Sequence, residues 1–189
     1  MTATRGQHFD VPSPGKLPMA VMLAAGLLVP GAIMVAAIAK GASLPPAAAI
    51  AAGLALAIVF ALFAAMLKRR SVSVGDGMLV VHGALYTRRV PLASLDIDGA
   101  RVLSLDEHRE DRPFWRLNGI GLPGYRVGHY RTRSRKRAFC LLTDLRRVVR
   151  LEETGGHLLL LSLERPRDLL KALQDRDQGS STLTPSQGR

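Results

Sequence analysis

Two long apolar stretches dominate the first third of the chain. Pro18–Ala39 contains no charged side chain, and Ala47–Leu67 contains no charged or polar side chain at all. At a rise of about 1.5 Å per residue, each stretch is long enough to cross a hydrocarbon core of about 30 Å. The segment 40–46 between them is short and rich in turn residues, so the two helices should be antiparallel. We therefore expect a two-helix transmembrane hairpin over residues 18–67.

The second stretch carries a small side chain at every fourth position. These residues are Ala49, Gly53, Ala57, Ala61 and Ala65. Helices approach each other closely in a membrane where small residues form one face. We expect this face to pack on the first helix, and self-association of two copies through it is the alternative.

The charges that flank the apolar stretches predict the orientation. Cations precede the first stretch and follow the second, whereas the connecting segment has only Lys40; the flanking cations are Arg5, Lys16, Lys68, Arg69 and Arg70. Positive charge favours the cytoplasmic side. The sequence thus predicts a multi-pass protein of the inner (plasma) membrane with both termini, including the segment 1–17, in the cytoplasm. A cleaved signal peptide is the alternative, but the first apolar stretch is longer than the apolar region of a typical signal peptide.

After residue 70 the pattern becomes that of β-strands. Short apolar or alternating runs are separated by Gly, Pro and charged residues, which is typical of a small sandwich or barrel. The runs predict eight strands, namely Ser71–Val74, Met78–His82, Tyr86–Pro91, Ala100–Leu105, Tyr125–Thr132, Ala138–Leu142, Val148–Glu152 and His157–Ser162.

The turns and the C-terminal region complete an α+β pattern. Asp76-Gly77 and Gly155-Gly156 are favourable hairpin turns. Pro166–Gln174 has the leucine spacing of an amphipathic helix that would cap the strands. Asp175–Arg189 is polar and low in hydrophobic residues, so we expect a disordered tail.

The strand region also resembles a known family. Asn118–Tyr130, Arg137–Asp144 and Arg147–Leu151 are similar to the bacterial pleckstrin-homology-like (PH-like) domains. The resemblance covers residues 69–174 and implies a PH-like β-barrel with a C-terminal capping helix that follows transmembrane helices. It implies no catalytic residues. The short acidic first hairpin loop, Gly75–Gly77, argues against specific binding of inositol phosphates.

The charge of the chain is strongly basic, with 26 Lys and Arg against 15 Asp and Glu and a formal net charge of +11. Nearly all of these charges follow residue 67. The densest basic run lies between two predicted strands, with Arg126 nearby; its cations are Arg131, Arg133, Arg135, Lys136 and Arg137. Such a run near a membrane attracts anionic lipid headgroups. A protein partner and a merely solvated loop are the alternatives, and nucleic acid is not expected, because no aromatic residues are interleaved with the cations.

Other patterns point to structure rather than chemistry. Gly119-x-Gly121-x-x-Gly124 matches a dinucleotide-binding string, but a strand follows it instead of a helix, so we interpret it as a structural loop. The acidic cluster 106–111 is expected to be a solvated loop rather than a metal site. His82, His129, His157 and Cys140 have no catalytic partners at useful spacing and are expected to be structural. We expect no cofactor and no metal.

Phe114 and Trp115 follow Pro113 and are expected inside, because a small barrel needs its few aromatic residues in the core; an exposed interfacial anchor is the alternative. Together these features predict a non-enzymatic docking or scaffold module, anchored in the membrane, that binds a protein partner or the anionic inner leaflet. The alternatives are a membrane enzyme with an unrecognised site and a basic module that binds nucleic acid.

Overall fold

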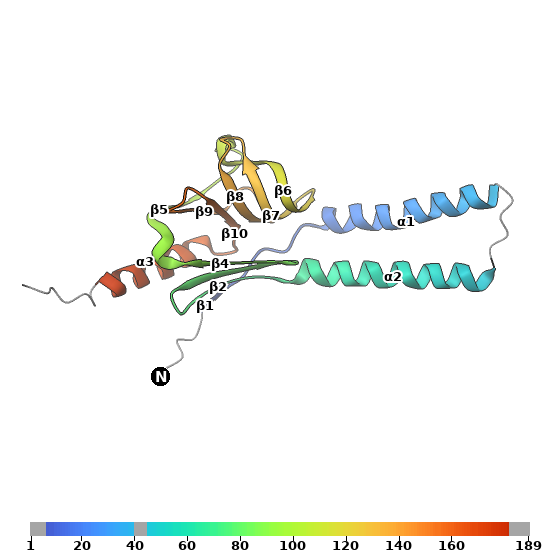
Figure 1. The fold of residues 1–189 in the computed structure, drawn as a ribbon, viewed down its shortest axis with the longest axis horizontal. Helices are drawn as coiled ribbons and strands as arrows, with labels where there is room; N and C mark the ends of the chain where they lie inside the picture. The colour runs from blue at the N-terminus through green and yellow to red at the C-terminus, as the bar shows by residue number, and fades with distance from the viewer. Residues whose placement is uncertain (1–6, 40–44, 182–189) are drawn as a thin grey trace, which may run out of the picture.

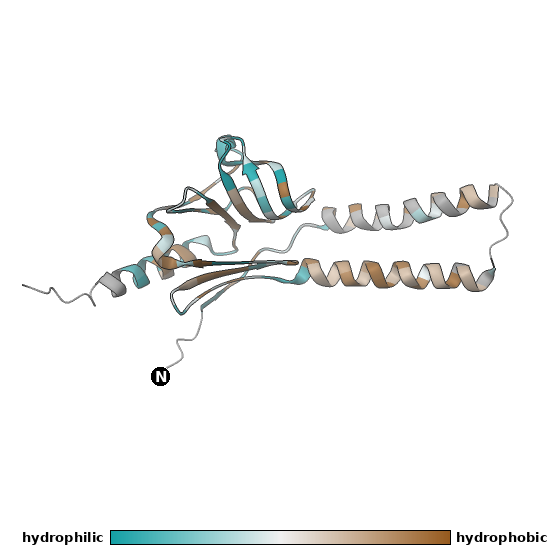
Figure 2. Ribbon diagram, in the orientation of Figure 1, coloured by the Kyte–Doolittle hydropathy of each residue, from teal (hydrophilic) through white to brown (hydrophobic). Residues whose placement is uncertain are grey.

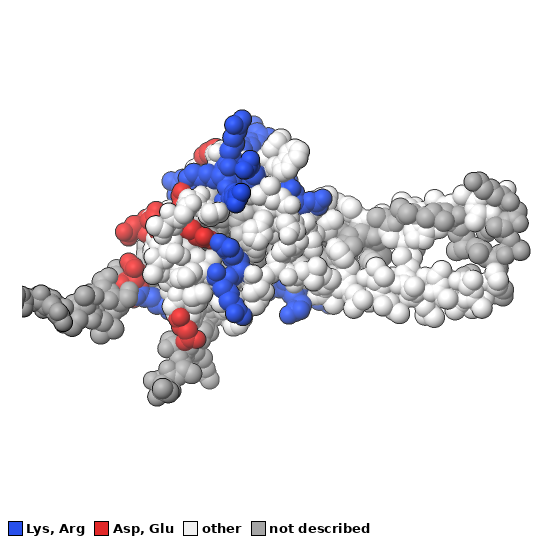
Figure 3. Space-filling view, viewed as in Figure 1, with Lys and Arg blue, Asp and Glu red and all other residues white. Residues whose placement is uncertain are grey.

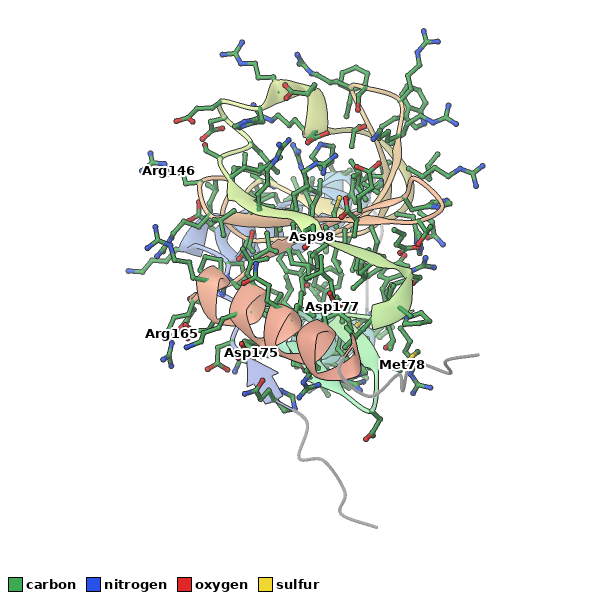
Figure 4. The ribbon with its side chains drawn as sticks, turned by 90° about the vertical axis from the view of Figure 1, so that its left-hand side faces the viewer. Met78, Asp98, Arg146, Arg165, Asp175 and Asp177 are labelled. Carbon is green, nitrogen blue, oxygen red and sulfur yellow. The ribbon has the colours of Figure 1, made fainter. Side chains whose placement is uncertain are left out.

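The computed structural model describes residues 7–39 and 45–181, which form an α+β fold with two β-sheets (Figure 1). Two long helices project from one end of the sheet domain, and a third helix covers its other end (Figures 1 and 4). The helices are α1 (Lys16–Ala39), α2 (Pro46–Lys68) and α3 (Pro166–Ser181). The strands are β1 (Gln7–Phe9), β2 (Arg70–Gly75), β3 (Met78–Gly83), β4 (Tyr86–Pro91), β5 (Leu95–Leu103), β6 (Pro113–Leu122), β7 (Tyr125–Thr132), β8 (Arg137–Leu142), β9 (Val148–Glu153) and β10 (Leu158–Ser162). Short 3₁₀ turns occupy Leu92–Ser94 and Arg109–Asp111.

The first sheet is an antiparallel ribbon in the order β1-β2-β3-β4. The predicted turn at Asp76-Gly77 joins β2 to β3, and both of its residues have positive φ angles, 49° and 69°. Val72 and Val74 alternate with more exposed neighbours along β2 and are fully buried. This period of two places one face of the ribbon on the hydrophobic core.

The second sheet has the order β5-β9-β10-β8-β7-β6, and β10 pairs parallel with β8 and antiparallel with β9. Gly155-Gly156 lies in the turn between β9 and β10, as predicted. Leu158–Leu161 of β10 are all fully buried, and they alternate between two hydrophobic clusters on opposite faces of the sheet. A continuous leucine run is what a strand covered on both faces requires.

The C-terminal helix closes the core. Leu169 and Leu173 of α3 are fully buried in the larger cluster, as the leucine spacing predicts. The helix begins at Pro166 but continues to Ser181, beyond the predicted end at Gln174. The first part of the expected disordered tail is therefore helical, and residues 182–189 lie outside the described residues.

The N-terminal segment also belongs to the sheet domain, in addition to the expected residues 69–174. β1 pairs with β2, and Val11 is only 6% exposed in the same core as Leu67. The backbone N–H of Glu164, which precedes α3, donates to the carbonyl of Asp10 at 3.0 Å. The domain is therefore built from chain on both sides of the helix pair.

The two long helices lie side by side in antiparallel directions (Figure 1). The last turns of α2 join the hydrophobic core of the domain through Leu67, with Phe63 packed against it. The described surface of α2 is almost uniformly hydrophobic (Figure 2). By length and composition, one stretch of the described residues, Ile50–Lys68, could cross a membrane, and 6% of it is buried. α1 does not meet the same test over its described residues, so the second membrane crossing is not shown.

The small-residue face of α2 does not pack as expected. Gly53, Ala57, Ala61 and Ala65 are all exposed, and a Cβ atom on Gly53 would meet no atom within 4 Å. The prediction that this face packs on the first helix is thus wrong at these positions. Self-association through α2 stays a prediction.

Candidate docking site

Strand β6 exposes three large apolar side chains within a stretch of four residues. Phe114 is 69% exposed, Trp115 is 65% exposed and Leu117 is 49% exposed. The expectation that the two aromatic residues are buried is wrong, because they lie on a stretch of the edge strand β6, residues 114–118, in which every residue is exposed. An apolar cluster of this kind on a protein surface is typical of an interaction site.

Two β-bulges direct these three side chains toward one hollow. The pairing of β6 with β7 slips by one residue between Pro113 and Trp115, and again between Arg116 and Asn118. Phe114 and Leu117 are the extra residues. In a regular strand the residues 114, 115 and 117 would not share a face, since side chains alternate. Here all three line one open hollow of about 640 Å³.

Three arginines, one near the end of β7 and two in the turn between β7 and β8, line the same hollow. Arg131, Arg133 and Arg135 are exposed, and none forms an ion pair within the described part of the chain. The guanidinium of Arg133 lies 5.7 Å from the centre of the Phe114 ring, within the range of a cation–π contact. We call the six residues Phe114, Trp115, Leu117, Arg131, Arg133 and Arg135 the tip patch.

Hydrogen bonds within the turn hold the tip patch in one conformation. The backbone N–H of Thr132 donates to the carbonyl of Lys136 at 2.9 Å, and that of Arg135 donates to the carbonyl of Thr132 at 3.0 Å. The hydroxyl groups of Thr132 and Ser134 lie 2.8 Å apart, and Thr132 is buried. Arg135 has a φ of 65°, which reverses the chain at the turn.

The segment that precedes β6 braces the same turn from the side. The backbone N–H of Arg133 donates to the carbonyl of Arg112 at 3.2 Å, and that of Ser134 donates to the carbonyl of Glu110 at 2.9 Å. Asp111, between these two acceptors, is 5% exposed. The backbone of the basic turn is therefore ordered, so binding a ligand would have to order only the arginine side chains.

A charge network fixes that brace to the middle of the sheet. Arg150 of β9 donates to Asp111 at 2.8 Å and to Glu152 at 2.7 Å, and Lys136 donates to the other oxygen of Glu152 at 2.6 Å. The hydrogen bond from Lys136 is the largest of the interactions that hold the pKa of Glu152 below its usual range. Lys136, predicted as a ligand contact, is thus engaged in the support of the patch.

The remaining predicted contact residues lie apart from the hollow. Arg126 is half-buried and donates to the carbonyl of Pro113 at 3.2 Å. Arg137 is exposed and stands directly opposite Arg131 across β7 and β8. Of the six predicted cations, three therefore lie on the tip patch. Arg137 lies beside the patch, and Arg126 and Lys136 make contacts that stabilise the fold.

The cations after α2 also differ in role. Lys68 and Arg69 are exposed, as expected for residues that flank a membrane span. Arg70 is half-buried and donates to the carbonyl of Leu67 at 3.0 Å and to that of Val11 at 3.4 Å. Arg70 therefore joins the end of α2 and the N-terminal segment to the sheet.

The position of the tip patch relative to the helices follows from β7. The strand begins beside the turn that lies near the start of α1 and ends at the basic turn, on the side of the domain (Figure 1). At about 3.3 Å per residue, its eight residues separate these two ends by about 26 Å. Lys and Arg side chains gather on this side of the domain, over the β6–β8 region (Figure 3). On the face shown, the described parts of the two long helices carry charged side chains only at the ends nearest the domain.

The glycine-rich string has a structural role, although it is not the loop that we expected. Gly119 and Gly121 lie within β6, and Gly124 has a φ of 75° in the turn to β7. Gly119 faces Gly128, and a Cβ atom on Gly119 would overlap the carbonyl oxygen of Val127. The string thus allows a close approach of two backbones, and no helix follows it that could bind phosphate.

The other polar candidates are also accounted for by the fold. No group of three or more His, Cys, Asp or Glu in the described parts of the chain could hold a metal ion. Burial, with a contribution from Arg88, lowers the pKa of His129, whose ring packs edge-on against Phe139 at 5.2 Å. Cys140 is fully buried, which raises its pKa and disfavours the reactive thiolate.

Comparison with protein-family models, with curated proteins and with solved structures finds no match to this chain. The resemblance to PH-like domains therefore stays a prediction, and so do the roles that it implies. The geometry of the tip patch is the observation from which a function has to be argued.

Proposed function

We propose that this protein is a non-enzymatic docking module, anchored in the membrane by α1 and α2, whose tip patch binds an acidic segment of a partner protein in the cytoplasm. The single observation that carries the docking role is the combination of an apolar hollow with three exposed arginines that form no ion pair with the described residues. The PH-like resemblance of residues 69–174, whose members follow membrane helices, agrees with this role.

The pairing of β1 with β2 supports a two-helix anchor. β1 precedes α1 and β2 follows α2, yet the two strands are hydrogen-bonded neighbours in one sheet. If α2 crosses a membrane, α1 has to cross it as well, because a single crossing would leave β1 and β2 on opposite sides. Two observations thus favour an antiparallel transmembrane hairpin: the apolar character of Ile50–Lys68 and the pairing of β1 with β2.

The flanking charges support a cytoplasmic position for the domain. Lys16 precedes α1, and Lys68 and Arg69 follow α2 at the end of the helix pair that carries the domain. Positive residues near the ends of spans favour the cytoplasmic side of the inner (plasma) membrane. Both termini would then be cytoplasmic.

Unfavourable charge placement supports a binding role for the tip patch. Arg131 and Arg137 are cross-strand neighbours, and like charges directly opposite each other destabilise a sheet. Arg133 and Arg135 add further positive charge in the same turn. Folding gains nothing from this arrangement, whereas an acidic ligand would neutralise it.

The position of the patch favours a protein partner over the leaflet. The tip patch lies at the end of β7 that is remote from the helices, and the joint between α2 and β2 is short and held by the hydrogen bonds of Arg70. A rigid domain of this shape presents the patch sideways to the cytoplasm. Direct contact with headgroups would require the whole domain to tilt.

Site-specific photo-cross-linking in intact cells tests the proposal. With a photoreactive amino acid in place of Leu117, we expect a protein adduct of defined size on illumination, and its yield should fall at least tenfold when Arg131, Arg133 and Arg135 are changed to Ser. The three cations supply most of the expected attraction, so their removal should weaken binding strongly.

The matched control carries the same photoreactive residue in place of Thr87, an exposed position on β4 that does not line the hollow. It should give no adduct of that size. Adducts to lipid alone at position 117 would assign the patch to the leaflet instead, and equal adducts at both positions, or no loss with the three serines, would contradict a docking site.

A further inference from the structure

The turn between β3 and β4 lies directly beside the end of α2. The backbone N–H of Ala84, in this turn, donates to the carbonyl of Arg69 at 2.7 Å. The neighbouring residue Gly83 is paired with Arg70, the first residue of β2. In Figure 1 the end of the ribbon formed by the β3–β4 turn meets the end of α2. The opposite end of β3, at Met78, faces the viewer in Figure 4, on the side of the domain remote from the two long helices.

The same turn presents one large apolar side chain to the outside. Leu85 is 71% exposed, although its neighbour Ala84 is 8% exposed. Ala84 has a φ of 49°, and this left-handed conformation helps to direct the chain so that Leu85 points away from the core. Leu85 contributes nothing to the packing of either hydrophobic cluster.

Two exposed cations at the end of α2 lie close to Leu85 through the backbone contact of the turn. Lys68 and Arg69 are both exposed at the end of α2, next to the turn that carries Leu85. An apolar tip flanked by cations is suited to a bilayer interface, where the apolar group enters the acyl boundary and the cations meet anionic headgroups. The rim of the domain that faces the helices thus has the chemistry of a lipid contact.

We infer that the β3–β4 turn is a second membrane contact, in which Leu85 inserts into the interfacial layer while Lys68 and Arg69 bind anionic headgroups. This inference rests on the proposed anchoring by α1 and α2. The contact fixes the domain at a third point beside its two helices, and it holds the tip patch away from the bilayer and open to a protein partner.

Quenching of tryptophan fluorescence by brominated lipids tests this contact in the full chain. Trp115 is the only tryptophan, so a Trp115→Phe background leaves the chain without one. Into it we would place Leu85→Trp, Phe60→Trp in the middle of α2, or Ala93→Trp on the exposed 3₁₀ turn before β5. Each variant is reconstituted in vesicles of phosphatidylcholine and phosphatidylglycerol that carry bromine either close to the headgroup or deep in the acyl chain.

We expect the tryptophan at position 85 to be quenched at least twofold more than that at position 93, and more by the shallow bromines than by the deep ones. The tryptophan at position 60 should be quenched more by the deep bromines. Quenching at position 60 together with equal, weak quenching at positions 85 and 93 would overturn the inference and leave the anchor intact. Absence of quenching at all three positions would overturn the anchor itself, and the inference with it.

Discussion

Replacing Gly128 with alanine is expected to destabilise the sheet domain by about 3 kcal/mol or more, because two separate costs add at this position. Gly128 has a φ of 113°, which side chains with a Cβ atom rarely adopt. A Cβ atom would also lie 2.5 Å from the carbonyl oxygen of Asn118 and 2.6 Å from the Cα of Gly119. Strands β6 and β7 would have to separate, and the tip patch on β6 would move with them.

The thermal midpoint of the detergent-solubilised full chain, followed by the circular dichroism of the sheet, measures this effect. A loss of 3 kcal/mol should lower the midpoint by roughly 10 °C. Gly156→Ala is the matched control, since Gly156 has a φ of 74° but open space around it. The control should cost about 1 kcal/mol. Equal midpoints for the two variants would show that β6 and β7 do not approach as closely as described.

Changing both Phe9 and Val11 to serine is expected to cost about 3–4 kcal/mol of domain stability. Val11 is buried and Phe9 is packed against the same core, so both lose apolar contacts and gain a hydroxyl group without an evident partner. The effect is large for a segment that precedes the helices, since the core is otherwise formed by residues from Phe63 onward. The same thermal measurement should show a midpoint lower by roughly 10 °C.

The matched control changes Gln7 and His8 to serine, two exposed residues of the same strand. It should alter the midpoint by no more than about 2 °C, because surface substitutions usually change stability by less than about 0.5 kcal/mol. If the two double variants behave alike, the N-terminal strand is not part of the core, and the argument for an even number of membrane crossings loses its basis.

The strands that follow α2 could be predicted where their side chains alternate or are continuously apolar. β4 and β7 have the predicted bounds, and β10 was found from its leucine run. The strand β1 was missed because it has only three residues, and its pairing with β2 joins residues as far apart in the chain as Gln7 and Val74, which no local pattern records. β6 was missed because glycines and two bulges interrupt its alternation.

The candidate site was also predicted only in part. The cations of the basic turn were visible in the sequence, because a run of Arg and Lys between two strands has to be exposed. The apolar half of the site was not visible, because Phe114 and Trp115 look like core residues until the exposure and the two bulges of β6 are known. Lys136 differs from the other cations because it forms an ion pair with Glu152. This pair depends on tertiary structure, which brings β9 next to the basic turn, and no local pattern in the sequence reveals it.

The side of the membrane on which each part of the chain lies tests the central claim most directly. Single cysteines in place of His8, Pro45 or Arg165, all exposed, can be labelled with a membrane-impermeant maleimide in intact cells and in inverted vesicles; the native Cys140 is buried and should not react. We predict that positions 8 and 165 react only in inverted vesicles and that position 45 reacts only in intact cells. Labelling of positions 8 and 165 from opposite sides, or of position 45 from the same side as position 8, would contradict a two-helix anchor that carries a cytoplasmic docking domain.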